Sequence, residues 1–201
     1  MIKYIIYFII ILFISLYLFI RFKFRFWFKQ PVFHIYNLRY WIFPIGQIKN
    51  KLDDKDSIDY DNLVHTEKIS TISTEKKELF TSLIKFHYLD NKKEYYNPPK
   101  HAILDYLNYH NNSTFISLYY KYDTIKRINE KDIKTSKIIA GMSSRPLTCK
   151  IKNNSIVVGY VDFLCVHKNH RKKGLAQKII YTHAVDASKD MKNPIFLFKR
   201  E

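Results

Sequence analysis

The sequence predicts a mixed α/β domain that is preceded by one transmembrane helix. Three observations lead to this prediction. An uncharged apolar run lies near the N-terminus, two segments with helical spacing precede several β-rich segments, and a buried strand leads through a basic glycine turn into another helix. Apolar residues make up 47% of the chain, which is enough to build a core. The 201 residues suit one ordinary domain plus an extension.

The apolar run covers residues 4–20 and predicts a membrane helix. Such a helix spans about 25 Å, near the short limit for crossing a bilayer. Aromatic and basic side chains alternate over residues 22–29, as is typical of the headgroup zone. Because cations are concentrated after the run, the positive-inside rule places residues 21–201 in the cytoplasm. A cleaved signal peptide and a buried core helix are alternatives, but no small-x-small cleavage site follows Ile20.

The apolar pattern divides the rest of the chain into helices and strands. Residues 30–32 begin an extended stretch, and the polar residues 49–62 predict a loop. Helices are expected at residues 74–89, 102–109 and 174–187. Strands are expected at residues 115–122, 138–143, 147–151, 155–166 and 195–198, with a hairpin turn about Asn153-Asn154.

The chain is strongly basic, with 34 Lys and Arg against 18 Asp and Glu. Nucleic acid, anionic lipid or a polyphosphate ligand could each account for this charge, as could solvated lysines without a partner. Nucleic acid is disfavoured because the aromatic residues cluster at the membrane end and not within a basic patch. The two cysteines, Cys149 and Cys165, form no CxxC pair, so neither a disulfide framework nor a zinc site is predicted.

A short motif near the C-terminus carries the chemistry. Phe163-Leu164-Cys165-Val166 is an apolar run suited to a buried strand, and Arg171-x-x-Gly174-x-Ala176 follows it. Gly174 and Ala176 let a backbone approach a ligand closely, and the helix that follows adds the positive end of its dipole. The motif therefore predicts a pyrophosphate pocket of the kind that holds an acyl-CoA. A plain solvated turn is the alternative.

The glycine turn resembles the acyl-CoA signature of the GNAT superfamily of N-acyltransferases. Together with the preceding FLCVHK it is similar to the signature of the N-myristoyltransferase family. A second, distant match is Phe26-Trp27-x-x-Gln30-Pro31-Val32, which resembles that family's N-terminal acyl-CoA-binding segment. Residues 83–91 (LIKFHYLDN) and 138–146 (IIAGMSSRP) are weaker matches in the right order. The resemblance covers residues 24–198 and implies a GNAT-like mixed sheet flanked by helices.

The resemblance also implies roles for individual residues. The backbone N–H groups of Phe163 and Leu164 would form an oxyanion hole, and no acyl-enzyme would form. Myristoyl-CoA would be the co-substrate, with no permanently bound cofactor, and it would contact three sets of residues: Arg25, Phe26 and Trp27; Phe163, Leu164, Cys165 and Val166; and Lys172, Gly174, Leu175 and Ala176.

The implied function is transfer of a myristoyl group to the N-terminal glycine of proteins, by a chain anchored in the membrane with its catalytic domain in the cytoplasm. The expected organisation is an anchor at residues 1–21, a juxtamembrane acyl-CoA-binding segment at 22–48 and the N-terminal half of an N-myristoyltransferase-like domain at 49–201. Another GNAT-type N-acyltransferase, and a truncated acyl-CoA-binding protein without catalysis, are the alternatives.

Two departures from the family pattern bear on activity. Gly174 stands where the family usually has arginine, which is closer to the general acetyltransferase pattern. The chain also stops at Glu201, whereas the family has a second half that supplies much of the peptide groove and a terminal carboxylate that acts as the base. A separate chain that supplies this half is therefore a possible partner.

Several residues have both a chemical and a structural interpretation. His167 and His170 could suggest a metal, but no acidic or cysteine partner has ligand spacing, and no metal site is predicted. Asp90 or Asp162 could act as the base, and a structural or surface carboxylate is the alternative for each. Cys165 lies inside an apolar run, which favours a buried small hydrophobe over a nucleophile.

Overall fold

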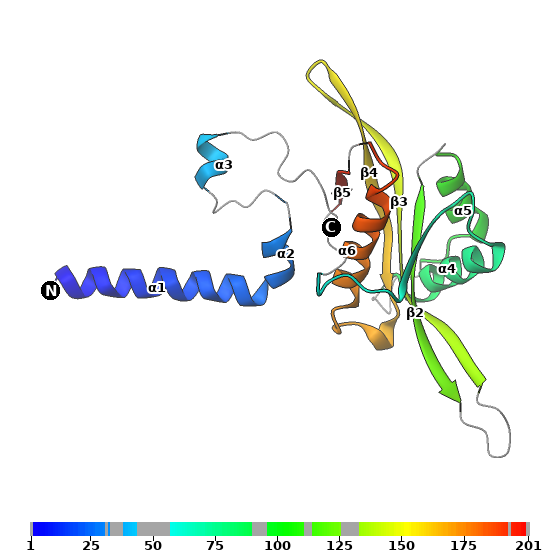
Figure 1. Ribbon diagram of the computed structural model, residues 1–201, viewed down its shortest axis with the longest axis horizontal. Helices are drawn as coiled ribbons and strands as arrows, with labels where there is room; N and C mark the ends of the chain where they lie inside the picture. The colour runs from blue at the N-terminus through cyan, green and yellow to red at the C-terminus, as the bar shows by residue number, and fades with distance from the viewer. Residues whose placement is uncertain are drawn as a thin grey trace. The chain divides into compact units, whose positions relative to one another are not determined.

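The computed structural model describes residues 2–30, 32, 38–43, 57–89, 96–110, 114–125, 133–192 and 194–199 (Figure 1). The chain forms two compact units, Met1–Lys51 and Leu52–Glu201.

The first unit begins with the long helix α1 (Ile2–Lys23), followed by the short helices α2 (Arg25–Lys29) and α3 (Leu38–Ile42). None of the residues of α1 is buried, and the helix is long and apolar enough to cross a membrane. At its C-terminal end the guanidinium of Arg21 lies 5.5 Å from the ring centroid of Phe28. The predicted helix over residues 4–20 is therefore confirmed as a helix and as a candidate membrane span.

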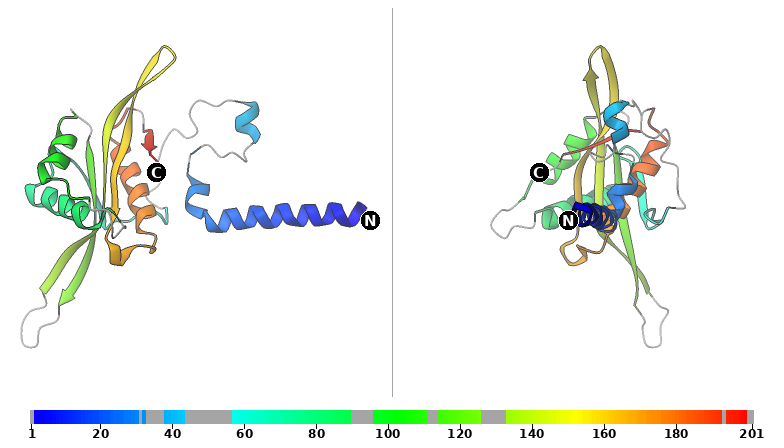
Figure 2. Two further views of the ribbon diagram at one scale, coloured as in Figure 1. Left: turned by 180° about the vertical axis from the view of Figure 1, so that it is seen from behind. Right: turned by 90° about the vertical axis from the view of Figure 1, so that its left-hand side faces the viewer.

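The second unit is built on a five-stranded sheet with the order β1-β2-β3-β4-β5. Its strands are β1 (Val64–Lys68), β2 (Phe115–Ile125), β3 (Ile133–Ile151), β4 (Asn154–Val166) and β5 (Phe196–Phe198). Neighbouring strands are antiparallel except β4 and β5, which are parallel. Helices α4 (Thr74–His87) and α5 (Lys100–Asn108) cover one face of the sheet, and α6 (Leu175–Ser188) covers the other (Figures 1 and 2).

Most predicted elements are present, but one strand was not predicted and two expected strands are one. Of the expected loop at residues 49–62, residues 57–62 form neither helix nor strand, and residues 49–56 are outside the described part of the chain. Strand β1 begins at Val64, and the sequence did not reveal it because only Val64 of its five residues is buried. The expected strands at 138–143 and 147–151 are parts of the single strand β3. Pro146 does not interrupt it, because β2 pairs with β3 only as far as Ser144 and leaves that edge of Pro146 without a neighbouring strand.

The hairpin between β3 and β4 is confirmed, but its turn lies one residue earlier than expected. Lys152 adopts the left-handed conformation with φ of 53°, and β4 already begins at Asn154. Helix α4 begins after Ser73, whose hydroxyl accepts a hydrogen bond from the backbone N–H of Lys76 at 3.4 Å. This cap fixes the start of the helix that packs over β3 and β4.

Two apolar clusters hold the helices to the sheet. The cluster under α4 and α5 includes Phe80, Ile84, Leu107, Ile116, Leu118 and Cys165. The cluster under α6 includes Val64, Tyr119, Ile139, Ala140, Met142, Val161 and Ile179. Both faces of the sheet are therefore buried where the helices lie, and the apolar residues of β2 point alternately to the two clusters.

His183 of α6 is fully buried and contacts the face of the sheet that α6 covers. Its Nδ1 lies 2.7 Å from the hydroxyl of Ser117 on β2, and its Nε2 lies 2.8 Å from the hydroxyl of Ser144 on β3. The Ser117 hydroxyl is in turn 2.7 Å from that of Thr66 on β1. One imidazole thus links α6 to two central strands, and burial lowers its pKa to about 3.

Helix α4 packs closely on the sheet at Gly141 of β3. A Cβ at this position would lie 2.9 Å from the ring of Phe80 and 3.0 Å from the side chain of Leu83. We expect Gly141→Ala to lower the free energy of unfolding by about 1–3 kcal/mol, because the fully buried Phe80 ring has to move. Chemical denaturation measures this loss. The loss should shrink in a Phe80→Leu background, and an equal loss in both backgrounds would contradict the assignment.

Candidate active site

A β-bulge in β4 lies at the centre of the candidate site. Gly141 pairs with Cys165 and Ser143 pairs with Asp162, so Phe163 and Leu164 together face the single residue Met142. Phe163 adopts a left-handed conformation with φ of 49°, which is uncommon for an aromatic residue. The bulge directs Phe163 to the cluster under α4 and α5, and Leu164 to the cluster under α6.

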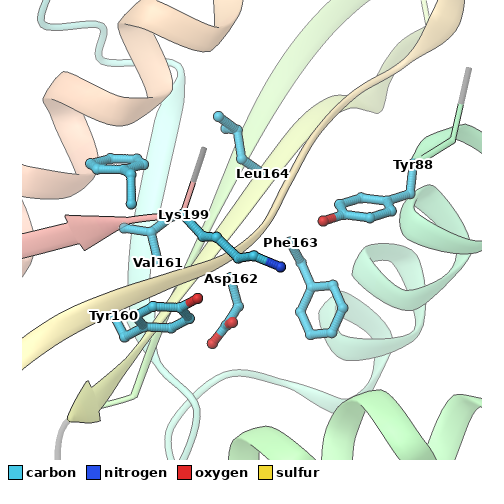
Figure 3. Close-up of a pocket in the computed structure, with 8 residues that line it drawn as sticks. Tyr88, Tyr160, Val161, Asp162, Phe163, Leu164 and Lys199 are labelled. Carbon is cyan, nitrogen blue, oxygen red and sulfur yellow. The ribbon is translucent and has the colours of Figure 1, made fainter. Parts of the chain in front are cut away.

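The bulge lies where the two parallel strands separate. Strand β5 pairs with β4 only over Gly159–Val161, and β4 continues to Val166. A pocket of about 350 Å³ opens at this point. It is lined by Tyr88, Tyr160, Val161, Asp162, Phe163, Leu164, Phe198 and Lys199 (Figure 3). The edge of β4 that carries the bulge therefore faces a cavity, and no other strand covers it in the part of the chain that the structure describes.

One carboxylate, that of Asp162, lines this pocket beside the bulge. Its Oδ2 accepts a hydrogen bond from Nε of Arg145 at 3.1 Å, and the two side chains are only 14% and 16% exposed. The Arg145 guanidinium lies over two rings, 5.0 Å from the centroid of Tyr106 and 4.9 Å from that of Tyr160. Burial raises the pKa of the Asp162 carboxyl above its ordinary value, although the nearby Arg145 opposes the shift.

The turn after β4 contains the predicted pyrophosphate segment. A short 3₁₀ helix (Lys168–His170) is followed by two left-handed residues, Lys172 with φ of 62° and Gly174 with φ of 75°. Gly174 is the N-cap of α6, which starts at Leu175 with no side-chain cap. Lys172, Lys173 and Gly174 are exposed. The helix N-terminus and two lysines thus meet at an open turn, as anion binding requires.

Arg171 has a different position from the lysines that follow it. Its Nε donates to the carbonyl of Val166 at 3.2 Å, and its guanidinium also donates to the carbonyl of His87. The side chain therefore ties the turn to the end of β4 and to the end of α4. The His87 and His167 rings lie nearby with their centroids 3.9 Å apart and their planes tilted by 35°, and burial lowers the pKa of both.

Cys165 and Val166 continue β4 beyond the bulge, and their side chains point into the two cores. The thiol of Cys165 is 2% exposed and lies 3.6 Å from the carbonyl of Leu83, and burial raises its pKa to about 12. Such a thiol stays protonated and is a poor nucleophile. Leu175 and Val166 pack against the cluster under α6.

The remaining predicted site residues are elsewhere or outside the described part of the chain. Arg25, Phe26 and Trp27 lie on α2 in the first unit, where the rings of Phe26 and Trp27 meet edge to face at 5.0 Å. Their contact with acyl-CoA stays a prediction. Asp90 lies outside the described residues. Within the described ranges, no three His, Cys, Asp or Glu side chains are placed so that they could hold a metal ion.

Several residues around the pocket were not identified from the sequence: Tyr88, Tyr106, Arg145, Tyr160 and Lys199. They lie after α4, on α5, on β3, on β4 and after β5, so no single short motif contains them all. Tyr88 and Arg145 fall within the weaker family matches at 83–91 and 138–146, which gave them no role at the site. The one local signal is Arg145, a charged residue between the two strands predicted at 138–143 and 147–151. A buried arginine needs a partner, so this position could have prompted a search for a carboxylate.

Three features define the GNAT class of acyltransferase fold: the separation of the parallel strands β4 and β5, the β-bulge where they separate, and the glycine turn before α6. The family model of the myristoyl-CoA:protein N-myristoyltransferase N-terminal domain matches residues 63–186. The chain therefore belongs to the N-myristoyltransferase family.

Solved structures agree with this fold. N-myristoyltransferase of Saccharomyces cerevisiae with bound myristoyl-CoA is similar with a TM-score of 0.55 and 19% identity, over 87% of this chain and 39% of that one. This chain thus spans about two fifths of the yeast protein. An aminoglycoside acetyltransferase from an uncultured soil sample has a TM-score of 0.44 and 16% identity, over 70% of this chain and 80% of that one. No curated protein sequence matched the chain.

Proposed function

We propose that this protein binds a long-chain acyl-CoA, with myristoyl-CoA as the natural choice, and transfers the acyl group to the N-terminal glycine of a peptide. The observation that carries the proposal is the bulge of Phe163 and Leu164. It lies inside the region that the family model matches and opens on a pocket between β4 and β5. The yeast relative that shares the fold holds myristoyl-CoA.

The proposed chemistry is direct attack of the glycine amine on the thioester. The backbone N–H groups of Phe163 and Leu164 stabilise the oxyanion, and fixed donors of this kind contribute about 3 kcal/mol each to transition-state stabilisation. Holding both reactants in one pocket supplies much of the remaining acceleration. The reaction needs no acyl-enzyme, in agreement with the high pKa of the buried Cys165 thiol.

The proposed acyl-CoA contacts continue along β4 and into the turn. Backbone groups of Cys165 and Val166 extend the binding edge, since their side chains are in the cores. Lys172, Gly174, Leu175 and Ala176 hold the pyrophosphate at the start of α6. Arg25, Phe26 and Trp27 contribute from the juxtamembrane segment.

We further propose that α1 anchors the protein in a membrane and that the second unit faces the cytoplasm. The supporting observations are the fully exposed apolar helix and the cations at its C-terminal end, Arg21 and Lys23. Anchoring would keep the pocket near the bilayer, where a long-chain acyl-CoA partitions.

A second candidate is acyl-CoA binding without transfer, and the matched region covers 39% of the yeast enzyme. In that case a separate chain that supplies the remaining part would restore transfer. A GNAT-type enzyme that uses a shorter acyl group is a third candidate.

One experiment separates these candidates. The purified full-length protein is incubated in detergent or vesicles with labelled myristoyl-CoA and a glycine-initiated peptide, and label on the peptide is measured by mass spectrometry. Transfer to this peptide, and not to one whose N-terminus is acetylated, supports the proposal. Binding without transfer favours the second candidate, and transfer from acetyl-CoA alone favours the third.

A further inference from the structure

The pocket contains a carboxylate whose position suits proton transfer. Asp162 immediately precedes the bulge residue Phe163, and both residues line the pocket. Figure 3 shows the Asp162 carboxyl between the side chains of Tyr160 and Phe163. Any group bound with its reacting carbonyl at the N–H groups of the bulge would therefore lie next to this carboxylate.

The surroundings of Asp162 hold it in one orientation. Nε of Arg145 donates to Oδ2 of Asp162 and also to the hydroxyl of Tyr106. The guanidinium lies 5.0 Å from the ring centroid of Tyr106 and 4.9 Å from that of Tyr160. The strand pairing supports the same arrangement, because Arg145 is opposite Tyr160 on β4. An arginine held by these hydrogen bonds and aromatic neighbours positions the carboxylate before any ligand binds.

We propose that Asp162 is the proton acceptor of acyl transfer in this protein, an inference that rests on the function proposed above. The neutral amine adds to the thioester carbonyl, which forms the C–N bond and places the negative charge on oxygen at the bulge. The Asp162 carboxylate takes a proton from the positively charged nitrogen of this adduct. The C=O bond then re-forms, the C–S bond breaks, and the thiolate takes the proton from Asp162. Peptide amide and free CoA thiol leave, and the carboxylate is restored.

The acid and base strengths fit this sequence of steps. A terminal amine has a pKa of about 8, so roughly a tenth of it is neutral at pH 7. Its nitrogen becomes far more acidic once it is bonded to the carbonyl carbon, and a carboxylate can then accept the proton. The thiolate, with a conjugate-acid pKa of about 8.5, readily removes the proton from a carboxylic acid. Burial of Asp162 makes it a stronger base than an exposed carboxylate.

Charged and titratable groups surround Asp162 from several elements. The groups that affect its protonation or share the pocket are Arg145 from β3, Tyr106 and His110 from α5 and the residues after it, Tyr160 from β4, Tyr88 from the end of α4, and Lys199 after β5. The pH profiles of the wild-type and Asp162→Asn proteins are therefore compared, because their difference isolates the ionisation of Asp162 from that of its neighbours.

The test compares Asp162→Asn with the wild-type full-length protein. Single-turnover transfer from myristoyl-CoA to a glycine-initiated peptide is measured from pH 5 to 9, together with myristoyl-CoA affinity and thermal stability. We expect the transfer rate of Asp162→Asn to fall roughly 10²- to 10⁴-fold with the affinity unchanged. Both proteins should lose rate below about pH 8 as the peptide amine is protonated. The further loss at the acid end, which protonation of Asp162 causes in the wild-type protein, should be absent from Asp162→Asn. In Asp162→Ala, added formate should restore part of the rate, which a merely structural ion pair would not allow.

Asp61→Asn is the matched control. Asp61 is 13% exposed and pairs with Lys178 at 2.8 Å, so it resembles Asp162 in burial and pairing but lies outside the pocket. This variant should be less stable than the wild-type protein. Its transfer rate should equal the wild-type rate when both are measured well below its melting temperature. A wild-type rate in Asp162→Asn, or loss of transfer without rescue by formate, overturns the role of Asp162 while the proposed function stands. A wild-type protein that transfers no acyl group overturns both.

Discussion

Gly174→Glu is expected to weaken myristoyl-CoA binding by about a hundredfold. Gly174 caps α6 at the open end of the turn, where the pyrophosphate is proposed to bind. A carboxylate about 5 Å from a phosphate charge costs roughly 3 kcal/mol at an effective dielectric constant of about 20. A Cβ at Gly174 would meet only the Gln177 side chain, at 3.8 Å, so the substitution is sterically accommodated. Isothermal titration calorimetry measures the loss.

Gly174→Gln is the matched control for this substitution. Both variants carry the same cost of about 1 kcal/mol for a side chain at φ of 75°, and they differ only in charge. Glu at the start of a helix favours the unliganded fold, so Gly174→Glu should be at least as stable as Gly174→Gln. If the two variants bind myristoyl-CoA equally well, the pyrophosphate does not lie at this turn.

Acidification from pH 6.5 to about 3 is expected to remove roughly 4–5 kcal/mol of stability through His183 alone. The histidine is fully buried, and its pKa is lowered from its ordinary value of 6.5 to about 3. Below pH 6.5 the unfolded chain therefore binds a proton that the folded chain does not. The free energy of unfolding consequently decreases as the pH is lowered. Denaturant unfolding at a series of pH values measures the slope, which reaches about 1.4 kcal/mol per pH unit.

His183→Gln separates this histidine from the other titrating groups. A glutamine amide can both donate and accept, so it can serve the Ser117 and Ser144 hydroxyls without gaining a charge in acid. His87 and His167 have lowered pKa values in both proteins and affect both slopes equally. We expect His183→Gln to be less stable at pH 7 but to lose less stability on acidification. Parallel pH profiles would contradict the prediction.

The sequence predicted best the parts of the fold that depend on neighbouring residues. The helix that became α4, the helix that became α6 and the turn at Gly174 each follow from a local pattern of apolar or glycine residues. Strand β1 was missed because its own residues show no alternating apolar pattern, and only one of its side chains is buried. The strand is stabilised by its pairing with β2, which the local sequence does not show.

The candidate site was predictable only where one segment contains it. Phe163 and Leu164 were identified by a motif, but nothing in the motif showed that they form a bulge, because a bulge is defined by the partner strand. The arrangement of Arg145 between Tyr106 and Tyr160 depends on contacts between α5, β3 and β4. Contacts of this kind are set by the packing of distant segments and leave no periodic signal.

The left-handed backbone of Phe163 limits what this position can become. Glycine would relieve the backbone cost of about 1–2 kcal/mol. It would also remove a ring whose centroid lies 6.0 Å from that of Tyr88 and 6.2 Å from that of Tyr106. A β-branched residue would fit the strand and worsen the backbone conflict. The unfavourable backbone conformation of Phe163 therefore cannot be relieved by a single substitution without another loss. Selection for greater heat resistance should leave this position unchanged and act elsewhere in the domain.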